Sequence, residues 1–293
     1  MSILLDGKKL SEKILDELKE TVTQMNMPIT LGIVLVGEDP ASKAYVEQKK
    51  RAGERIGVKV KVFPYPETIS ARELRAEIAR ICHLPSMRGV IVQLPLPARP
   101  KPLGGEGGPH ALKQDRILNA ILPKLDVDVL GRTMFGAFAL GNSPIMPPTL
   151  AGIIRLLDEY KISLDGGKHV VLYGAGRLIG FPTAIEMMKR EATISVINKT
   201  TKNPERITKE ADILITGTPI PAHIGGDMLK DGVVIIDGGY GRTPEGKLTG
   251  NVIFDEAEKK ASYITPVPGG IGIMTVAMLF YNLIELTKYN TKG

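Results

Sequence analysis

The chain has 293 residues, of which 43% are hydrophobic and 24% are charged, and its formal net charge is +6. This length allows two domains, and the ordinary composition excludes a largely disordered protein. Basic residues are dispersed among acidic ones without a stripe of interleaved aromatics, so we expect small anionic ligands as partners and no nucleic acid.

The first half of the chain begins with the patterns of a helix, a strand and a second helix. Apolar spacings of three and four predict a helix over residues 8–25, and a β-rich run predicts a buried strand over residues 30–37. The second helix follows directly, and we expect Ser42 to be its N-cap. Ser42, Tyr45 and Lys49 are spaced i, i+3, i+7, which places a hydroxyl, a phenol and an amine on one helical face. That face is either catalytic or simply solvated.

Further elements extend this region into a β-α-β-α-β order, which predicts a parallel sheet. They are a strand, a helix capped by Ser70 and another strand, over residues 58–63, 70–83 and 89–93. Gln93 ends the last of these strands, because Pro95 cannot continue a β-ladder. In open α/β sheets ligands bind at the carboxyl ends of strands, so Gln93 lies on the expected ligand side.

An unusual Pro/Gly-rich segment and an acidic segment follow. Residues 98–110 predict a mobile surface loop, and a short helix is expected over residues 111–121. Asp126 and Asp128 are two residues apart, so an extended backbone would place both carboxylates on the same side. A solvated acidic turn is the alternative.

The second half predicts a doubly wound α/β domain. We place the domain boundary between residues 147 and 148, and we expect Thr149 to cap a helix that ends at Tyr160. A last amphipathic helix is expected over residues 274–288. The predicted buried strands cover residues 169–173, 194–197, 212–216 and 233–237.

A glycine turn joins the first of these strands to a helix that runs to about Arg190. Strand, glycine turn and helix together let backbone N–H groups approach a pyrophosphate at the helix N-terminus. The spacing is G-x-G-x-x-x-G, so a plain tight turn is the alternative. The turn consists of Gly174, Ala175, Gly176, Arg177, Leu178, Ile179 and Gly180.

The residues after the next strand indicate which dinucleotide binds. NAD-binding proteins usually place an acidic residue here to hold the ribose 2′-hydroxyl, and this chain has none. Lys199 and Lys202 could neutralise a 2′-phosphate instead, so we predict NADP, with NAD possible. Besides residues 174–179, the predicted cofactor contacts are Asn198, Lys199, Thr200 and Thr218.

Cysteine usage and hydropathy indicate the cellular compartment in which the protein folds. The single cysteine, Cys82, excludes an intramolecular disulfide, and the four histidines do not form a metal-ligand cluster with it. No stretch approaches eighteen consecutive apolar residues, and no leader pattern is visible at the N-terminus. We therefore expect a cytoplasmic protein without a metal site or membrane contact.

Four motifs give the chain a resemblance to the methylenetetrahydrofolate dehydrogenase/cyclohydrolase family over nearly its whole length. The motifs are Ser42-x-x-Tyr45-Val46-x-x-Lys49, Val92-Gln93-Leu94-Pro95-Leu96-Pro97, Asp126-Val127-Asp128, and Thr265-Pro266-Val267-Pro268-Gly269-Gly270 with Met274-Thr275. Any one motif could arise by chance, but all four occur in the family's order.

This resemblance implies a fold and two activities. The fold is a two-domain α/β protein: an N-terminal folate-binding catalytic domain over residues 1–147, and a Rossmann-like NAD(P)-binding domain over residues 148–273. The last helix, residues 274–293, returns to the first domain, the folate cleft lies between the domains, and the family is usually homodimeric. The activities are NADP-dependent oxidation of 5,10-methylenetetrahydrofolate and hydrolysis of the methenyl product to 10-formyltetrahydrofolate.

The resemblance also implies roles for individual residues. Lys49 would transfer protons, Gln93 would support Lys49, Tyr45 would line the folate site and Asp128 would hold the pterin. The remaining substrate contacts would be Pro268, Gly269 and Gly270.

This chain departs from the family pattern near the cofactor. Ala175 and Gly176 replace the usual Arg-Ser, Asn198-Lys199 replaces His-Ser, and Asn251 replaces Asp in Gly-Asp-Val. Three alternatives therefore remain: a shikimate-dehydrogenase-like NADP enzyme, a family member with only one of the two activities, and a non-catalytic folate or nucleotide binder.

Overall fold

The chain divides into two compact units in a computed structural model, which describes residues 2–97, 113–164, 167–243 and 246–292. One unit, here called the three-stranded unit, comprises Ile14–Met146 and Leu279–Gly293. The other, the six-stranded unit, comprises Met1–Lys13 and Pro147–Met278. Helix α1 (Gly7–Met25) and helix α10 (Ile271–Lys292) each contribute residues to both units. The predicted Pro/Gly loop over residues 98–110 lies outside the described residues.

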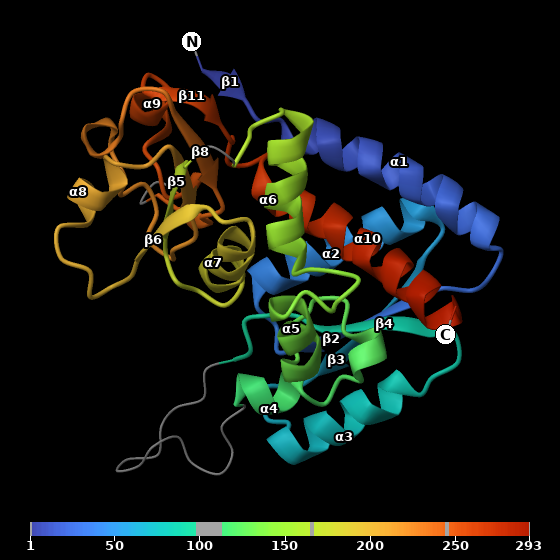
Figure 1. Ribbon diagram of the computed structural model, residues 1–293. Helices are drawn as coiled ribbons and strands as arrows, with labels where there is room; N and C mark the ends of the chain where they lie inside the picture. Colours follow the sequence, from blue (N-terminus) through green and yellow to red (C-terminus); the bar gives the residue numbers. More distant parts are fainter. Residues whose placement is uncertain (1, 98–112, 165–166, 244–245, 293) are drawn as a thin grey trace, which may run out of the picture. The chain divides into compact units, whose positions relative to one another are not determined.

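The three-stranded unit contains the predicted β-α-β-α-β order (Figure 1). Its strands are β2 (Thr30–Val36), β3 (Lys59–Tyr65) and β4 (Met87–Val92). They are parallel in the order β3-β2-β4, and the connecting helices are α2 (Pro40–Ile56) and α3 (Ala71–Cys82). The central strand β2 is buried at every residue, as expected for a parallel sheet covered on both faces.

Each face of this sheet has its own helical cover. On one face Val90 packs in a core with Ile78 of α3 and Leu118 of α4 (Gln114–Leu118). On the other face Gly53 of α2 lies so close to β3 that an added Cβ would be 2.5 Å from the Val60 side chain and 3.4 Å from Phe280 of α10. The α10 stretch Ile271–Thr291 is long and apolar enough to cross a membrane, but 67% of it is buried in the protein, as in a core helix.

The start of α2 differs from the prediction. Asp39 is the N-cap, because its carboxylate accepts a hydrogen bond of 2.7 Å from the Ser42 backbone N–H, and Pro40 begins the helix. Ser42 is therefore in the first turn, and its expected role as N-cap was wrong. For α3 the expected cap is confirmed, since Ser70 and Glu73 form a reciprocal capping box.

The acidic segment is a turn and not an extended segment, and Asp126 within it is buried, so the solvated alternative does not hold for this residue. It follows a short 3₁₀ helix, Pro123–Leu125, and precedes α5 (Arg132–Ala139). The backbone N–H of Val127 bonds to Leu125 O at 3.0 Å, and Val129 has a φ of 56°. Because the chain curls here, Asp126 and Asp128 have different surroundings.

The six-stranded unit has one parallel sheet in the order β1-β11-β8-β7-β5-β6. The strands are β1 (Ile3–Leu4), β5 (His169–Tyr173), β6 (Thr193–Ile197), β7 (Ile213–Thr216), β8 (Val233–Asp237) and β11 (Ala261–Ile264). The four predicted strands are confirmed. Strands β1 and β11 were missed, because they are short, with two and four residues.

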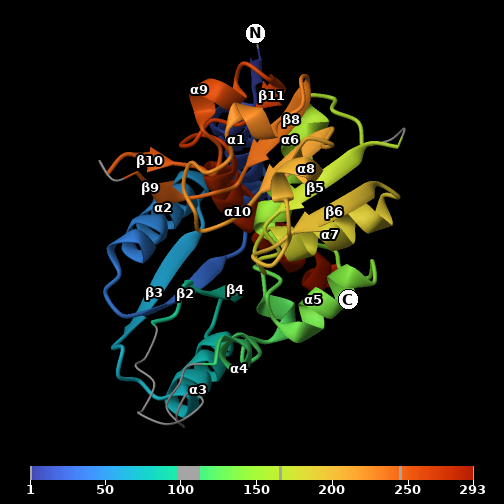
Figure 2. The same ribbon diagram turned by 90° about the vertical axis from the view of Figure 1, so that its left-hand side faces the viewer.

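Helices and a small hairpin complete this unit. Helix α7 packs against β5 and β6, as Figure 2 shows. Thr149 was wrongly expected to cap α6: that helix starts one residue earlier, and Thr149 Oγ1 instead accepts a hydrogen bond from Thr275 Oγ1. The elements are α6 (Pro148–Glu159), α7 (Gly180–Lys189), α8 (Pro204–Thr208), a 3₁₀ helix (Gly226–Met228), α9 (Phe254–Ala257) and the antiparallel pair β9 (Gly241–Arg242) and β10 (Leu248–Thr249).

Candidate active site

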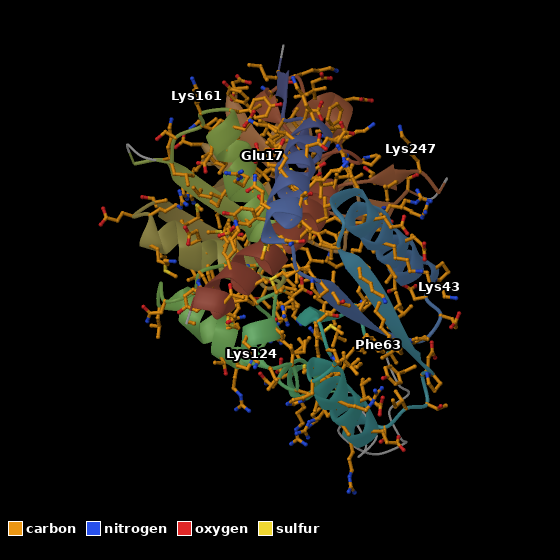
Figure 3. The ribbon with its side chains drawn as sticks, turned by 90° about the vertical axis from the view of Figure 1, so that its right-hand side faces the viewer. Glu17, Lys43, Phe63, Lys124, Lys161 and Lys247 are labelled. Atoms are coloured by element: carbon orange, nitrogen blue, oxygen red, sulfur yellow. The ribbon has the colours of Figure 1, made fainter. Side chains whose placement is uncertain are left out.

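A buried lysine lies on the inner face of α2. Lys49 is only 9% exposed, and its Nζ donates a hydrogen bond of 2.7 Å to Gln93 Oε1. Gln93 follows directly after β4, and its Nε2 donates to Leu94 O at 2.7 Å, so the backbone orients the amide oxygen toward the lysine. By contrast, Lys43 extends from the solvent side of the same helix (Figure 3).

The rest of this helical face matches the predicted i, i+3, i+7 arrangement. Ser42 is 3% exposed, and its hydroxyl has no hydrogen-bond partner among the residues that the structure describes. Tyr45 is half-buried, one turn before Lys49. The solvated alternative therefore does not apply to this face.

Burial moves the proton affinities of two facing groups. Desolvation lowers the pKa of Lys49 below its ordinary value of 10.5, and the nearby negative charge of Asp128 opposes this shift. Desolvation also raises the pKa of Asp128, with the positive charge of Lys49 opposing. Both groups are thus shifted toward neutral pH, the condition for an efficient exchange of protons.

The two carboxylates of the acidic segment have separate functions. Asp126 is 1% exposed and accepts hydrogen bonds from the backbone N–H groups of Gly131 at 2.7 Å and Leu130 at 3.3 Å. Burial raises its pKa to about 6, and the Gly131 hydrogen bond opposes the shift. Asp126 therefore shapes the turn, whereas Asp128 interacts electrostatically with Lys49.

Substitutions at these two positions should have different consequences. Asp126→Ala leaves two buried backbone N–H groups without acceptors, so we expect a loss of about 2–4 kcal/mol in the free energy of unfolding, measured by urea denaturation. Asp128→Asn preserves shape but removes a charge, so we expect an unchanged denaturation midpoint and a roughly tenfold or greater rise in KM for the folate substrate. A large stability loss in Asp128→Asn together with an unchanged KM would contradict this division.

The glycine turn before α7 brings backbone segments very close together. Gly174 has a φ of +116°, and a Cβ added there would be 2.5 Å from Gly217 O. A Cβ on Gly180 would overlap the Gly174 carbonyl oxygen and lie 2.7 Å from its carbon. A Cβ added at Gly176, in contrast, would have Gly217 O as its nearest neighbour, at 4.0 Å. This close approach fits a turn whose backbone contacts a pyrophosphate, because side chains would fill the space.

The other predicted cofactor residues follow the carboxyl ends of adjacent strands. Asn198 comes after β6, and its Oδ1 accepts hydrogen bonds from the Thr200 backbone at 2.9 Å and the Thr200 hydroxyl at 2.7 Å. Lys199 and Lys202 are exposed in this turn, and Thr218 follows β7. Since β6, β5 and β7 are parallel neighbours, these residues share one edge of the sheet with the glycine turn.

Two buried polar residues at this edge, Asp237 and Asn251, were not among the predicted site residues. Asp237 at the end of β8 is 2% exposed and accepts hydrogen bonds from the Thr216 hydroxyl at 2.7 Å and the backbone N–H groups of Gly239, Asn251 and Val252 at 2.8–3.0 Å. It thereby joins the ends of β7 and β8 to a distant loop. Its place between a buried strand and two glycines was the available signal.

Asn251 holds the Thr218 loop. Its Oδ1 accepts from the Thr218 backbone N–H at 2.9 Å, and its Nδ2 donates to the carbonyls of Thr218 at 3.0 Å and Ile220 at 2.6 Å. An aspartate could not donate to these carbonyls, so the family departure at this position has a structural reason here.

The predicted substrate residues divide between the two units. Tyr45, Lys49 and Asp128 belong to the three-stranded unit. The segment Pro268–Gly270 belongs to the six-stranded unit and forms the tight turn before α10, in which Gly269 has a φ of +116°. Within the described parts of the chain, no group of three or more His, Cys, Asp or Glu side chains could hold a metal ion.

Fold and site together define an α/β protein that combines a dinucleotide-type glycine turn with a separate buried lysine. A model of the tetrahydrofolate dehydrogenase/cyclohydrolase catalytic domain matches residues 5–128, and a model of the corresponding NAD(P)-binding domain matches residues 147–291. The chain therefore belongs to the tetrahydrofolate dehydrogenase/cyclohydrolase family, which sets aside the shikimate-dehydrogenase-like alternative.

Individual relatives are similar over their whole length. The chain is 40% identical to the bifunctional protein FolD of Nautilia profundicola over 288 residues, which is 97% of each chain. The crystal structure of the bifunctional FolD from Campylobacter jejuni matches with a TM-score of 0.90 and 38% identity, covering 99% of this chain and 100% of that one. A Trypanosoma brucei FolD, solved with NADP and an inhibitor, has a TM-score of 0.90 and 28% identity, covering 100% and 99%.

Proposed function

We propose that the Lys49–Gln93 pair performs the proton transfers of a bifunctional folate enzyme. The chain oxidises 5,10-methylenetetrahydrofolate with NADP and hydrolyses the methenyl product to 10-formyltetrahydrofolate. The observation that carries the proposal is the 2.7 Å hydrogen bond from Lys49 Nζ to Gln93 Oε1 in a buried position, together with the lowered pKa of the amine.

Hydrolysis needs a group that first accepts and then returns a proton. Water adds to the methenyl carbon, and the neutral amine of Lys49 takes one of its protons. The carbon–N5 bond then breaks, N5 receives the proton from the Lys49 ammonium, and the remaining hydroxyl proton leaves as the formyl group forms. Gln93 keeps the Nζ oriented throughout, because its own amide is fixed by the Leu94 carbonyl.

Oxidation requires orientation more than acid–base chemistry. The bound cofactor would supply the acceptor for the hydride that leaves the methylene carbon. Asp128 would hold the paired N–H donors of the pterin in a charge-assisted contact, and Tyr45 would stack on the substrate's aromatic ring. Pro268, Gly269 and Gly270 would supply further substrate contacts. Residues 174–179, Asn198, Thr200 and Thr218 would hold the dinucleotide, with Lys199 and Lys202 at its 2′-phosphate.

Domain roles, assembly and compartment belong to the same proposal. Residues 1–147 with the helix 274–293 would form the folate-binding catalytic domain, and residues 148–273 the dinucleotide-binding domain. The family-model matches support the boundary near residue 147, because the catalytic-domain model ends at residue 128 and the NAD(P)-binding-domain model begins at residue 147. We further propose a cytoplasmic homodimer, as the family resemblance implies.

The experiment that tests this function measures both reactions with the purified protein. Absorbance of reduced cofactor follows oxidation of methylenetetrahydrofolate with NADP and NAD in parallel, and loss of methenyl absorbance follows hydrolysis. We expect both activities, with a KM for NADP at least about tenfold below that for NAD, because two lysines face the 2′-phosphate. Lys199→Ala should reduce the difference between the KM for NADP and the KM for NAD. Binding without turnover would overturn the proposal, and turnover with NAD alone would overturn the roles of Lys199 and Lys202.

A further inference from the structure

Apart from Lys49 and its partners, the three-stranded unit has a polar pocket of about 380 Å³. Three of its five lining residues are arginines, one from each of three different helices. The lining residues are Arg75 of α3, Asp115 and Arg116 of α4, Asn119, and Arg132 of α5.

The backbone around this pocket is fixed from several directions. Asn119 Oδ1 accepts a hydrogen bond of 2.7 Å from the Arg132 backbone N–H, which ties the end of α4 to the beginning of α5. Ile78 of α3 and Ile117 of α4 are fully buried in one shared core. The backbone positions of the three arginines are therefore fixed by the fold, and their exposed side chains line the hollow.

The charges of the pocket are unbalanced. Among the residues that the structure describes, no ion pair engages Arg75, Arg116 or Arg132, and Asp115 is the only acidic residue lining the pocket. By comparison, Arg80, also on α3, pairs with Glu77 at 2.8 Å. Three guanidinium groups around one hollow repel each other, and an anion between them would relieve that repulsion. Guanidinium groups also bind carboxylates and phosphates in a bidentate manner.

We propose that this arginine pocket binds a multivalent oxyanion, a group with at least two carboxylates or phosphates. One source is an oligoglutamate tail on the folate substrate, and another is a free phosphate compound. The first source rests on the proposed function. The pocket belongs to the same compact unit as Lys49 and Asp128, and a tail of several glutamates extends from the end of the substrate opposite the pterin.

The test compares the full-length wild-type protein with the triple variant R75Q/R116Q/R132Q. For the tail, KM is measured with monoglutamyl and pentaglutamyl methylenetetrahydrofolate. We expect the wild type to have a roughly tenfold lower KM for the pentaglutamate, and the triple variant to lose this difference while keeping its kcat and its KM for the monoglutamate. For free phosphates, calorimetric titration with pyrophosphate is expected to show binding that the triple variant lacks.

A control variant and the comparison of two probes distinguish the possible outcomes. Arg80→Gln is the matched control, because it removes one positive charge from α3 outside the pocket and should leave both KM values unchanged. Pyrophosphate binding without a pentaglutamate advantage identifies the free compound as the source. Equal behaviour of wild type and triple variant toward both probes overturns the proposal. A wild type that binds pyrophosphate but turns over neither folate would instead refute the proposed function and leave the pocket standing.

Discussion

Replacing Lys49 by methionine is expected to lower kcat for methenyl hydrolysis by about 10²–10⁴-fold. Methionine keeps a flexible apolar stem of similar length, so the buried face of α2 should still pack. What disappears is the amine to which we assign the acceptance and return of the proton. The measurement is the initial rate of methenyl absorbance loss, with circular dichroism to show that the fold is retained.

Lys50→Met is the matched control for this substitution. Lys50 is the next residue on α2, its side chain is 39% exposed, and it pairs with Glu47 at 2.6 Å. Such an exposed pair contributes little to stability, so both activities should stay within about twofold of the wild type. Undiminished hydrolysis in Lys49→Met would exclude Lys49 as the proton carrier.

The pH profile of hydrolysis should report the same group. Because burial lowers the pKa of Lys49, the amine becomes neutral below its ordinary value of 10.5. The catalysed rate, after subtraction of the uncatalysed rate, is expected to rise with pH through the lowered pKa and to level off before pH 10.5. The same pKa shift affects stability. Between the lowered pKa and 10.5 the unfolded chain binds more protons than the folded chain, so the free energy of unfolding rises with pH across this interval.

Gly180→Ala is expected to raise KM for NADP by at least tenfold and to lower the melting temperature of the protein. The new Cβ would overlap the carbonyl oxygen of Gly174 and lie 3.0 Å from the Cα of Ala175. Both neighbours are backbone atoms, so the glycine turn must open for α7 to begin, and overpacking of this kind costs about 1–3 kcal/mol. The measurements are the dehydrogenase rate against NADP concentration and a thermal denaturation curve.

Gly176→Ala is the control for Gly180→Ala, because it also replaces a glycine of the turn but brings no atoms into overlap. The atom nearest to a Cβ at Gly176 would be Gly217 O at 4.0 Å, so the melting temperature should not change. Methenyl hydrolysis is expected to persist in Gly180→Ala, since Lys49 and Gln93 belong to the other compact unit. A normal KM for NADP in Gly180→Ala would show that this turn does not hold the dinucleotide.

Local patterns were enough to predict most helices and strands, because the period of the apolar residues depends only on the element itself. The capping box at Ser70 and the buried strands after residue 168 are examples. Where two candidates compete, local rules are weaker. Asp39 and Ser42 can both cap α2, and the hydrogen bond from the Ser42 N–H to Asp39 decides between them. Strand β1 exists only because it pairs with β11, more than 250 residues later in the chain.

The sequence by itself determined the kind of chemistry: a helix carrying Tyr45 and Lys49, a glutamine at a strand end, and a glycine turn between strand and helix. Tertiary structure decided how these groups behave. Only folding buries Lys49 beside Gln93 and so lowers its pKa, because desolvation depends on neighbours that are distant in sequence. In the same way, the fold made Asp126 a structural residue, left Asp128 beside the lysine, and assembled three arginines from separate helices around one pocket.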